Sequence, residues 1–252
     1  MSTSSFQGHY QSPININKEL AEYDSSLKPL EINYDPKSAI KIVNVGHCFN
    51  VEFEDTKGKS VLTGGPLNEV YRLLQCHFHW GSSDIEGSEH SIDGIKYPSE
   101  MHLVHWNVQK YSSAAEAAKH CNGLAVIGVF LEVGKRNPGI ENIIDHLDNI
   151  KTKGKEDTFT ELDLLSLLPK DLQYWTYPGS LTVAPFSECV TWIILKETIT
   201  ISTKQLEKFR SVLCTSENED PCPILKNNRC IQPLEGRIVR SSWWQNRTFS
   251  TT

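Results

Sequence analysis

The chain has 252 residues, of which 38% are hydrophobic and 22% are charged, as in an ordinary globular protein. Its formal net charge is −6 and it has no clustered Lys/Arg stripe, which argues against nucleic acid as a partner. No apolar run approaches the roughly 18 residues that span a bilayer, and the N-terminus lacks the features of a secretory signal, so we expect a cytoplasmic protein without a membrane span.

Short alternating runs broken by Gly, Pro, Asn and Asp recur along the chain and predict a β-rich protein. In "FNVEFED", Phe49, Val51 and Phe53 alternate with polar residues, as in a strand with one buried face. No repeat, linker or low-complexity segment divides the sequence, so we expect one domain over residues 1–252. Further strands are predicted over residues 40–45, 71–80, 101–108, 124–133 and 189–197.

Helices are expected to be a minority. One helix is predicted within "NPGIENIIDHLDNIKTKG", residues 137–154, between a Pro start and a Gly stop. Its apolar residues share one helical face: they are Ile140, Ile143, Ile144, Leu147 and Ile150. A second short helix is predicted from Lys204 to Leu213.

The seven cysteines are scattered, odd in number and without a C-x-x-C pair, which argues against a zinc-cysteine site and a full disulfide framework. Free thiols in a reducing compartment are the simplest interpretation. A single bridge among Cys214, Cys222 and Cys230 stays open. The sequon at Asn246 matters only if the chain is secreted.

The segment "QCHFHWG" places two histidines two residues apart in a predicted strand. Because side chains alternate along a strand, Gln75, His77 and His79 are expected to share one face. Cys76 is expected to be a small buried hydrophobe rather than a fourth metal ligand. The opposite face is predicted to carry Leu74, Cys76, Phe78 and Trp80.

The same alternation in "SEMHLVHW" puts Glu100, His102 and Val104 on one face. If the two strands pair, His102 joins the other two rings, and three imidazoles leave the fourth tetrahedral position of Zn²⁺ open for water. Gln75 and Glu100 lie on the right faces to fix the second ring nitrogens. H-x-H spacing alone is weak evidence and more often marks core or surface histidines, so the metal hypothesis depends on these supporting groups.

The sequence resembles the α-class carbonic anhydrases, most closely the animal cytosolic type, in the family's order from about Gln11 to Arg237. The resemblance implies a mainly β fold built on a large, twisted, mostly antiparallel central sheet with short surface helices. It also implies zinc-dependent, reversible hydration of CO₂ to bicarbonate and a proton. The matching segments are "QSPINI", "GHCFNVEF", "GGPLNEVYRL", "QCHFHWGS", "GSEHSIDG", "EMHLVHWN", "GLAVIGVF", "YWTYPGSLTVAPFSECVTWI" and "NNRCIQPLEGR".

By this resemblance, zinc-bound hydroxide attacks CO₂. Glu89 in "GSEH" and Thr182 in "GSLTV" match the pair that orients the hydroxide, with the threonine donating a hydrogen bond to the carboxylate. His47 in "NVGHCFN" matches the proton shuttle. The zinc ligands would be His77, His79 and His102, supported by Gln75, Glu100 and the backbone of Asn227. Substrate contacts would come from Val104, Val126, Leu181, Thr182, Val183, Val190 and Trp192.

The sequence also departs from the family pattern. Only "MSTSSFQGHY" precedes "QSPINI", so we expect the usual N-terminal Trp and Tyr to be absent, with lower stability and slower proton transfer. Val45 replaces a polar residue common in active members, Val183 a frequent threonine and Ala184 a common proline, without removing a catalytic atom. The tail from about residue 241 to 252, with two adjacent tryptophans, is expected either to pack on the surface or to be disordered.

Two alternatives compete with this hypothesis. One is a carbonic-anhydrase-related binding protein without useful catalysis, but such proteins typically lose a zinc histidine, and all three are present here. The other is an unrelated H-x-H enzyme such as a cupin-type oxygenase or a metallo-hydrolase, whose ligand spacings "HFHWGSSDIE" does not supply. We expect a monomer that binds CO₂ and bicarbonate and is inhibited by sulfonamides, as the family implies.

Overall fold

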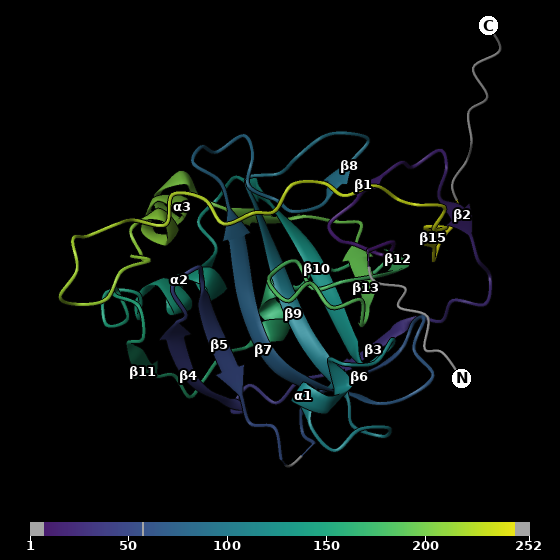
Figure 1. Ribbon diagram of the computed structural model, residues 1–252, viewed down its shortest axis with the longest axis horizontal. Helices are drawn as coiled ribbons and strands as arrows, with labels where there is room; N and C mark the ends of the chain where they lie inside the picture. The colour runs from purple at the N-terminus through teal and green to yellow at the C-terminus, as the bar shows by residue number, and fades with distance from the viewer. Residues whose placement is uncertain (1–7, 57, 245–252) are drawn as a thin grey trace, which may run out of the picture.

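Strands predominate in the computed structural model of this protein, which describes residues 8–56 and 58–244 (Figure 1). The predicted strands are confirmed, with ends shifted by no more than two residues. The strands are β1 (Asn15–Ile16), β2 (Glu22–Tyr23), β3 (Leu30–Asn33), β4 (Ala39–Asn44), β5 (Phe49–Phe53), β6 (Val61–Gly64), β7 (Tyr71–Trp80), β8 (Ser91–Ile92), β9 (Ser99–Asn107), β10 (Leu124–Val133), β11 (Glu156–Thr158), β12 (Tyr174–Gly179), β13 (Val190–Leu195), β14 (Ile199–Ile201) and β15 (Arg240–Ser241).

Thirteen of these strands form one sheet, whose main path runs β11-β4-β5-β7-β9-β10-β13-β12-β15-β2. Within the described residues its parallel pairs are β10 with β13, β10 with β14 and β15 with β2, and its other pairs are antiparallel. β1 and β8 form a separate two-stranded sheet. The prediction of a large, mostly antiparallel sheet is therefore confirmed.

The helical elements are short: α1 (Ala114–Ala117), α2 (Pro138–Ile144), the 3-10 helix η1 (Leu164–Leu167) and α3 (Thr203–Arg210). The predicted helix over 137–154 is shorter than expected, because the chain continues in turns after α2. Its apolar face nonetheless stays buried through Ile150, so burial did not require helix beyond α2. None of the helices in the described ranges has the length and apolar content needed to cross a membrane.

The second predicted helix, Lys204 to Leu213, starts one residue earlier and ends three residues sooner. A capping box between Ser202 and Gln205 fixes its start. Past its end, the N–H of Leu213 donates to the carbonyl oxygen of Lys151 at 2.8 Å. A helix that continued to Leu213 would have needed that N–H for its own carbonyl at Phe209.

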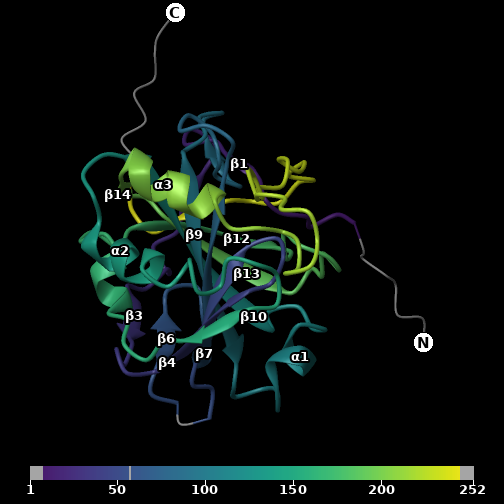
Figure 2. The same cartoon turned by 90° about the vertical axis from the view of Figure 1, so that its left-hand side faces the viewer.

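Two hydrophobic cores cover opposite faces of the sheet. The helix-side core lies under α2, α3 and η1, whereas α1 packs on the other face, where it buries Ala117. Figure 2 shows α2 and α3 grouped together and α1 well apart from them. The helix-side core includes Phe49, Cys76, Phe78, Leu103, Ile143 and Phe209. The second, here called the site-side core, includes Val104, Val126, Phe130, Val190 and Trp192.

Strand β7 contains a bulge that corrects one prediction. Its register against β9 shifts between Leu73 and Gln75, so the alternation slips by one residue at Leu74. Leu73 and Cys76 therefore face the helix-side core, while Leu74 packs against the site-side core. The prediction was right for Cys76 but wrong for Leu74, because it assumed unbroken alternation.

The C-terminal segment packs on the surface as far as the structure describes it. The ring of Trp243 lies edge-on to Trp175, with centroids 4.8 Å apart, and Trp244 lies 5.5 Å from Tyr23. Residues 245–252, with the sequon at Asn246, lie outside the described residues.

Candidate active site

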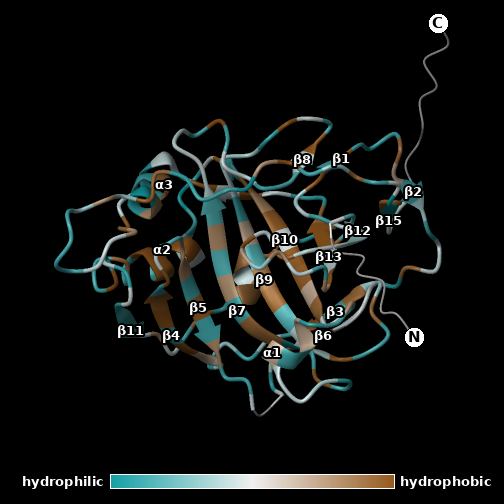
Figure 3. Cartoon of the chain, viewed as in Figure 1, coloured by the Kyte–Doolittle hydropathy of each residue, from teal (hydrophilic) through white to brown (hydrophobic). Residues whose placement is uncertain are grey.

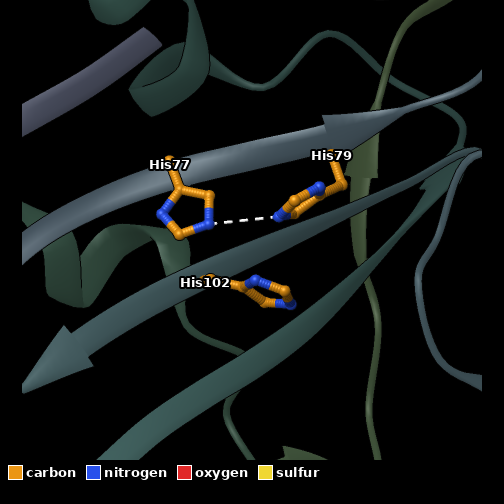
Figure 4. Close-up of side chains that lie close together, drawn as sticks. All are labelled: His77, His79 and His102. Carbon is orange, nitrogen blue, oxygen red and sulfur yellow. Dashed lines mark hydrogen bonds between the residues drawn. The ribbon is translucent and has the colours of Figure 1, made fainter. Parts of the chain in front are cut away.

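Strand register brings three histidines together on the site-side face. β7 and β9 are antiparallel neighbours, and His77 lies directly opposite His102. His79 and His102 are each 1% exposed, whereas His77 is half-buried. In Figure 3 hydrophilic segments lie within β7 and β9, in the middle of the sheet. Figure 4 shows the three rings grouped together beside these strands.

Each ring has one nitrogen committed to a hydrogen-bond acceptor. His77 Nδ1 lies 2.8 Å from Gln75 Oε1, His79 Nδ1 lies 3.0 Å from the carbonyl oxygen of Asn227, and His102 Nε2 lies 2.8 Å from Glu100 Oε1. Because these oxygens only accept, the ring nitrogens must donate. The opposite nitrogens, Nε2 of His77, Nε2 of His79 and Nδ1 of His102, therefore carry free lone pairs.

These three free nitrogens fit a tetrahedral metal ion. They lie within 4.8 Å of one another. His77 Nε2 and His79 Nε2 are only 3.1 Å apart, the contact dashed in Figure 4. Zinc bonds of about 2.0–2.1 Å to two tetrahedral ligands would separate those nitrogens by about 3.3 Å. Two lone pairs facing each other at this distance repel unless a cation or a shared proton lies between them.

Burial and neighbouring rings keep His77 and His79 neutral. Burial lowers the pKa of His77 well below its usual 6.5, and the neighbouring His79 and His102 lower it further. Burial likewise lowers the pKa of His79. Neutral imidazole is the form that binds metal ions, so the environment favours the ligand state.

Glu100 anchors the back of the site with four hydrogen bonds. Its Oε1 accepts from His90 and His102, and its Oε2 accepts from the backbone N–H groups of Glu89 and His90, all within 2.7–2.9 Å. Burial alone would raise the pKa of this carboxyl group. His90, His102 and these hydrogen bonds outweigh burial, and they hold the pKa well below its usual value. Glu100 is therefore an anion that fixes His102.

A second group of possible metal ligands consists of His90, Glu100 and His102. Its two rings already donate to the same oxygen, Glu100 Oε1. The other nitrogen of His90 lies 2.6 Å from the hydroxyl of Tyr177. His90 therefore has no free lone pair for a metal, and this cluster is a hydrogen-bond network.

Glu89 and Thr182 do not form the hydrogen bond that the resemblance implies. Glu89 Oε1 accepts from the backbone N–H of Arg229 at 2.9 Å. Glu89 Oε2 is buried without a partner among the described residues and lies 3.9 Å from His102 Nδ1. Both Glu89 and Thr182 are buried, at 0% and 8% exposure. The structure thus leaves an acceptor on Glu89 without the donor that we expected Thr182 to supply.

A cavity of about 800 Å³ lies next to the segment that supports this cluster, since Asn227, whose carbonyl oxygen accepts from His79, is among its lining residues. His47, Thr182, Val183 and Asn227 line it, so the residue expected to shuttle protons and the residues beside the rings share one space. His47 is exposed at the edge of the cavity. Partial burial, and to a lesser extent the charge of Lys153, lower the pKa of His47 below 6.5.

The predicted substrate wall is assembled on the site-side face. Trp192 packs edge-on against His102, with ring centroids 4.8 Å apart. Leu181 is partly buried against the same core, and Val183 lies on the cavity surface. The structure therefore gathers these apolar residues beside the histidines. The fully buried members are Val104, Val126, Val190 and Trp192.

Two contributors to the site were missed from the sequence. Gly128 lies opposite His102 in the pairing of β9 with β10, and a Cβ there would approach Glu100 Oε1 to 3.1 Å. A glycine inside a predicted strand signals such a close approach. Arg229 contributes its backbone N–H to Glu89, which no residue pattern could have indicated.

Comparison with known proteins agrees with this geometry. The family model for eukaryotic-type carbonic anhydrase matches residues 1–243. Carbonic anhydrase 1 of Mus musculus is 53% identical over 236 residues, which cover 94% of this chain and 90% of that protein. The match spans the strands that carry the three histidines and the loop that carries Thr182. The chain belongs to the eukaryotic-type carbonic anhydrase family.

Proposed function

We propose that His77, His79 and His102 hold Zn²⁺ and that the chain hydrates CO₂ at this site. As a member of the family, the protein is a carbonic anhydrase. One observation supports the metal most strongly: three ring nitrogens with free lone pairs converge, while the opposite nitrogen of each ring donates to a fixed acceptor. A bound zinc ion would acidify a water molecule, a property for which carbonic anhydrase is itself the standard example.

The chain's own residues would orient the reactants. Gln75, Glu100 and the carbonyl of Asn227 would keep the three rings in the tautomers needed for binding metal. CO₂ has no charge and needs an apolar surface rather than hydrogen-bond donors, and the wall around Val126 and Trp192 provides one. Val104, Val190, Leu181 and Val183 extend this surface.

We assign Thr182 and Glu89 the task of orienting the attacking oxygen. Thr182 would accept a hydrogen bond from it and donate its own proton to Glu89. The partnerless Oε2 of Glu89 supports this assignment, because it is a buried acceptor that lacks a donor. The pair would form when Thr182 turns its hydroxyl toward that oxygen.

His47 would carry the proton from the cavity to buffer. It is exposed, lines the cavity and has no hydrogen bond from its ring to another described residue, so the ring can rotate between the interior and solvent. Its lowered pKa favours release of the proton once it is accepted. A histidine that titrates near neutrality suits this role.

Stopped-flow CO₂ hydration by the zinc-loaded chain tests the proposal. We expect the rate of hydration to rise with pH near neutrality. His47→Ala should lower kcat in weak buffer, and concentrated imidazole buffer should restore that kcat. His120→Ala, which changes an exposed histidine stacked on Tyr111, is the matched control. A chain that binds one zinc ion per molecule without hydrating CO₂ would instead favour a binding protein that has kept the fold.

We further propose that the enzyme acts in the cytoplasm as a monomer and binds sulfonamide-type inhibitors. All seven cysteines are free thiols, which supports a reducing compartment. Zinc held by His77, His79 and His102 would bind the sulfonamide group, and the apolar wall would contact the rest of the inhibitor. Sedimentation tests the monomeric state, and inhibitor titration tests sulfonamide binding.

A further inference from the structure

Cys214 and Cys222 lie opposite each other in a short hairpin, and Cys214 lines the cavity that His47 and Thr182 also line. Leu213 and Pro223 form an isolated antiparallel bridge. On one side of it the N–H of Cys214 donates to the carbonyl oxygen of Cys222 at 2.8 Å, and on the other side Ile224 donates to Val212 at 2.8 Å. The N–H of Cys222 donates to Thr215 Oγ1 at 3.2 Å instead of back to Cys214. Opposed residues of an antiparallel pair have Cα atoms about 4.5–5.5 Å apart. Disulfides form when that separation is about 4.4–6.8 Å.

The surroundings of the two thiols differ. Cys222 is exposed, whereas Cys214 is half-buried and lines the cavity. A hydrogen bond between the two thiols, together with burial, raises the pKa of Cys214. No other two of the seven cysteines, all within the described residues, are paired through the backbone in this way.

We propose that Cys214 and Cys222 form a reversible modification site, in which a small-molecule disulfide such as oxidised glutathione converts the two thiols into one disulfide. The exposed Cys222 thiolate attacks the small disulfide, forms a mixed disulfide and releases one thiolate. The Cys214 thiol then gives up its proton to water, attacks the Cys222 sulfur and releases the second small thiol. Two protein thiols are oxidised and one small disulfide is reduced to two thiols, so atoms and electrons balance.

The cross-link would act on the segment that supports the metal cluster. Just after the hairpin, the carbonyl of Ile224 accepts the indole N–H of Trp80 at 2.7 Å. Three residues later, the carbonyl of Asn227 accepts from His79 at 3.0 Å. A disulfide would therefore tie down the start of the segment that positions His79. The modification depends only on the two thiols and holds whether or not the proposed function is correct.

The test uses the full chain incubated with oxidised glutathione, followed by intact mass and peptide mapping. We expect the native chain to lose two hydrogens and to yield a peptide pair joined through Cys214 and Cys222. Cys214→Ser should instead keep glutathione on Cys222, with at least ten-fold slower loss of the adduct than in the native chain. Cys121→Ser, which changes another exposed cysteine, should still form the cross-link.

Two results would overturn the inference. One is a native chain that collects stable glutathione on Cys222 without the internal disulfide. The other is equal exchange of the Ile224 amide hydrogen in the cross-linked and reduced chains. We expect exchange to be several-fold slower in the cross-linked chain, because the disulfide would hold the start of the supporting segment. Neither readout requires CO₂ hydration, so failure here is distinguishable from failure of the proposed function.

Discussion

Gly128→Ala is the substitution that best separates packing from metal support. A Cβ at this position would lie 2.7 Å from Ile194 Cδ1 and 3.1 Å from Glu100 Oε1. Ordinary contact begins near 3.4 Å, so the carboxylate must move by 3.4 − 3.1 = 0.3 Å. The same oxygen holds His102 at 2.8 Å. The strain should therefore act both on the core and on one proposed zinc ligand.

Overpacking of this kind costs about 1–3 kcal/mol. In a chain of this size it should lower Tm by roughly 2–12 °C. Disturbing a group that orients a metal ligand weakens metal affinity about 10–100-fold. Differential scanning calorimetry measures the first effect, and competition with a chelator for zinc measures the second.

Gly134→Ala is the matched control, because its Cβ would lie 2.8 Å from Thr200 Cγ2, an equally close contact away from the histidines. It should leave zinc affinity unchanged. If Gly128→Ala lowers Tm but binds zinc as tightly as the native chain, Gly128 serves packing alone. An unchanged Tm as well would refute the reasoning from the backbone approach.

Three further predictions concern single side chains. Lys153→Gln should raise the pKa of His47 toward 6.5 without fully restoring it, because burial is the larger cause, as NMR titration would show. Since folded His47 binds its proton more weakly than unfolded His47, its contribution to the free energy of unfolding should fall as pH drops through 6.5. Arg237→Leu removes the donors to four backbone carbonyls and should lower the free energy of unfolding in urea by about 3 kcal/mol or more. Its control is Arg240→Leu, which removes an ion pair whose arginine is 40% exposed and should cost less than about 1 kcal/mol. Thr182→Ala should lower kcat/KM at unchanged zinc affinity, and Thr182→Ser should keep most of the activity; equal rates for both would remove the hydroxyl from the mechanism.

Sequence patterns predicted the parts of the site that depend on strand periodicity. The alternation placed Gln75 and His77 on one face of β7, and Glu100 and His102 on one face of β9. The antiparallel pairing of the two strands brings those faces to the same side of the sheet. The pairing itself was only a condition in the sequence argument, because the partner of a strand depends on the whole sheet. The resemblance supplied Asn227, which lies 148 positions from His79 and has no local signal.

Other features could not be read from the sequence, for identifiable reasons. The bulge at Leu74 leaves no composition signal, since "LL" fits either face. The helix predicted within 137–154 was too long, because the turns after α2 bury the same apolar residues that a longer helix would bury. Thr182 and Glu89 do not form the contact that the motif implies, because a motif specifies residue types and not side-chain rotamers.

The bulge at Leu74 explains how one strand serves both faces of the sheet. Tyr71 and Leu73, 1% and 0% exposed, belong to the helix-side core, but Gln75 and His77, also at odd positions, face the site. One extra residue is therefore needed between the two sets, because a one-residue slip turns every later side chain to the other face.

Deleting Leu74 must turn one of those sets to the wrong face. Exposing Tyr71 and Leu73 should cost more than about 4 kcal/mol in unfolding free energy, whereas turning His77 away should abolish zinc binding. Leu74→Ala keeps the bulge and loses only a partly buried side chain, so it should bind one zinc ion with a modest loss of Tm. Zinc stoichiometry by atomic absorption, together with calorimetry, distinguishes the two failures. A deletion variant with native Tm and one bound zinc ion would show that the strand realigns without the bulge. The site would then tolerate a register of β7 against β9 that differs from the one in the structure, and the bulge would not be needed.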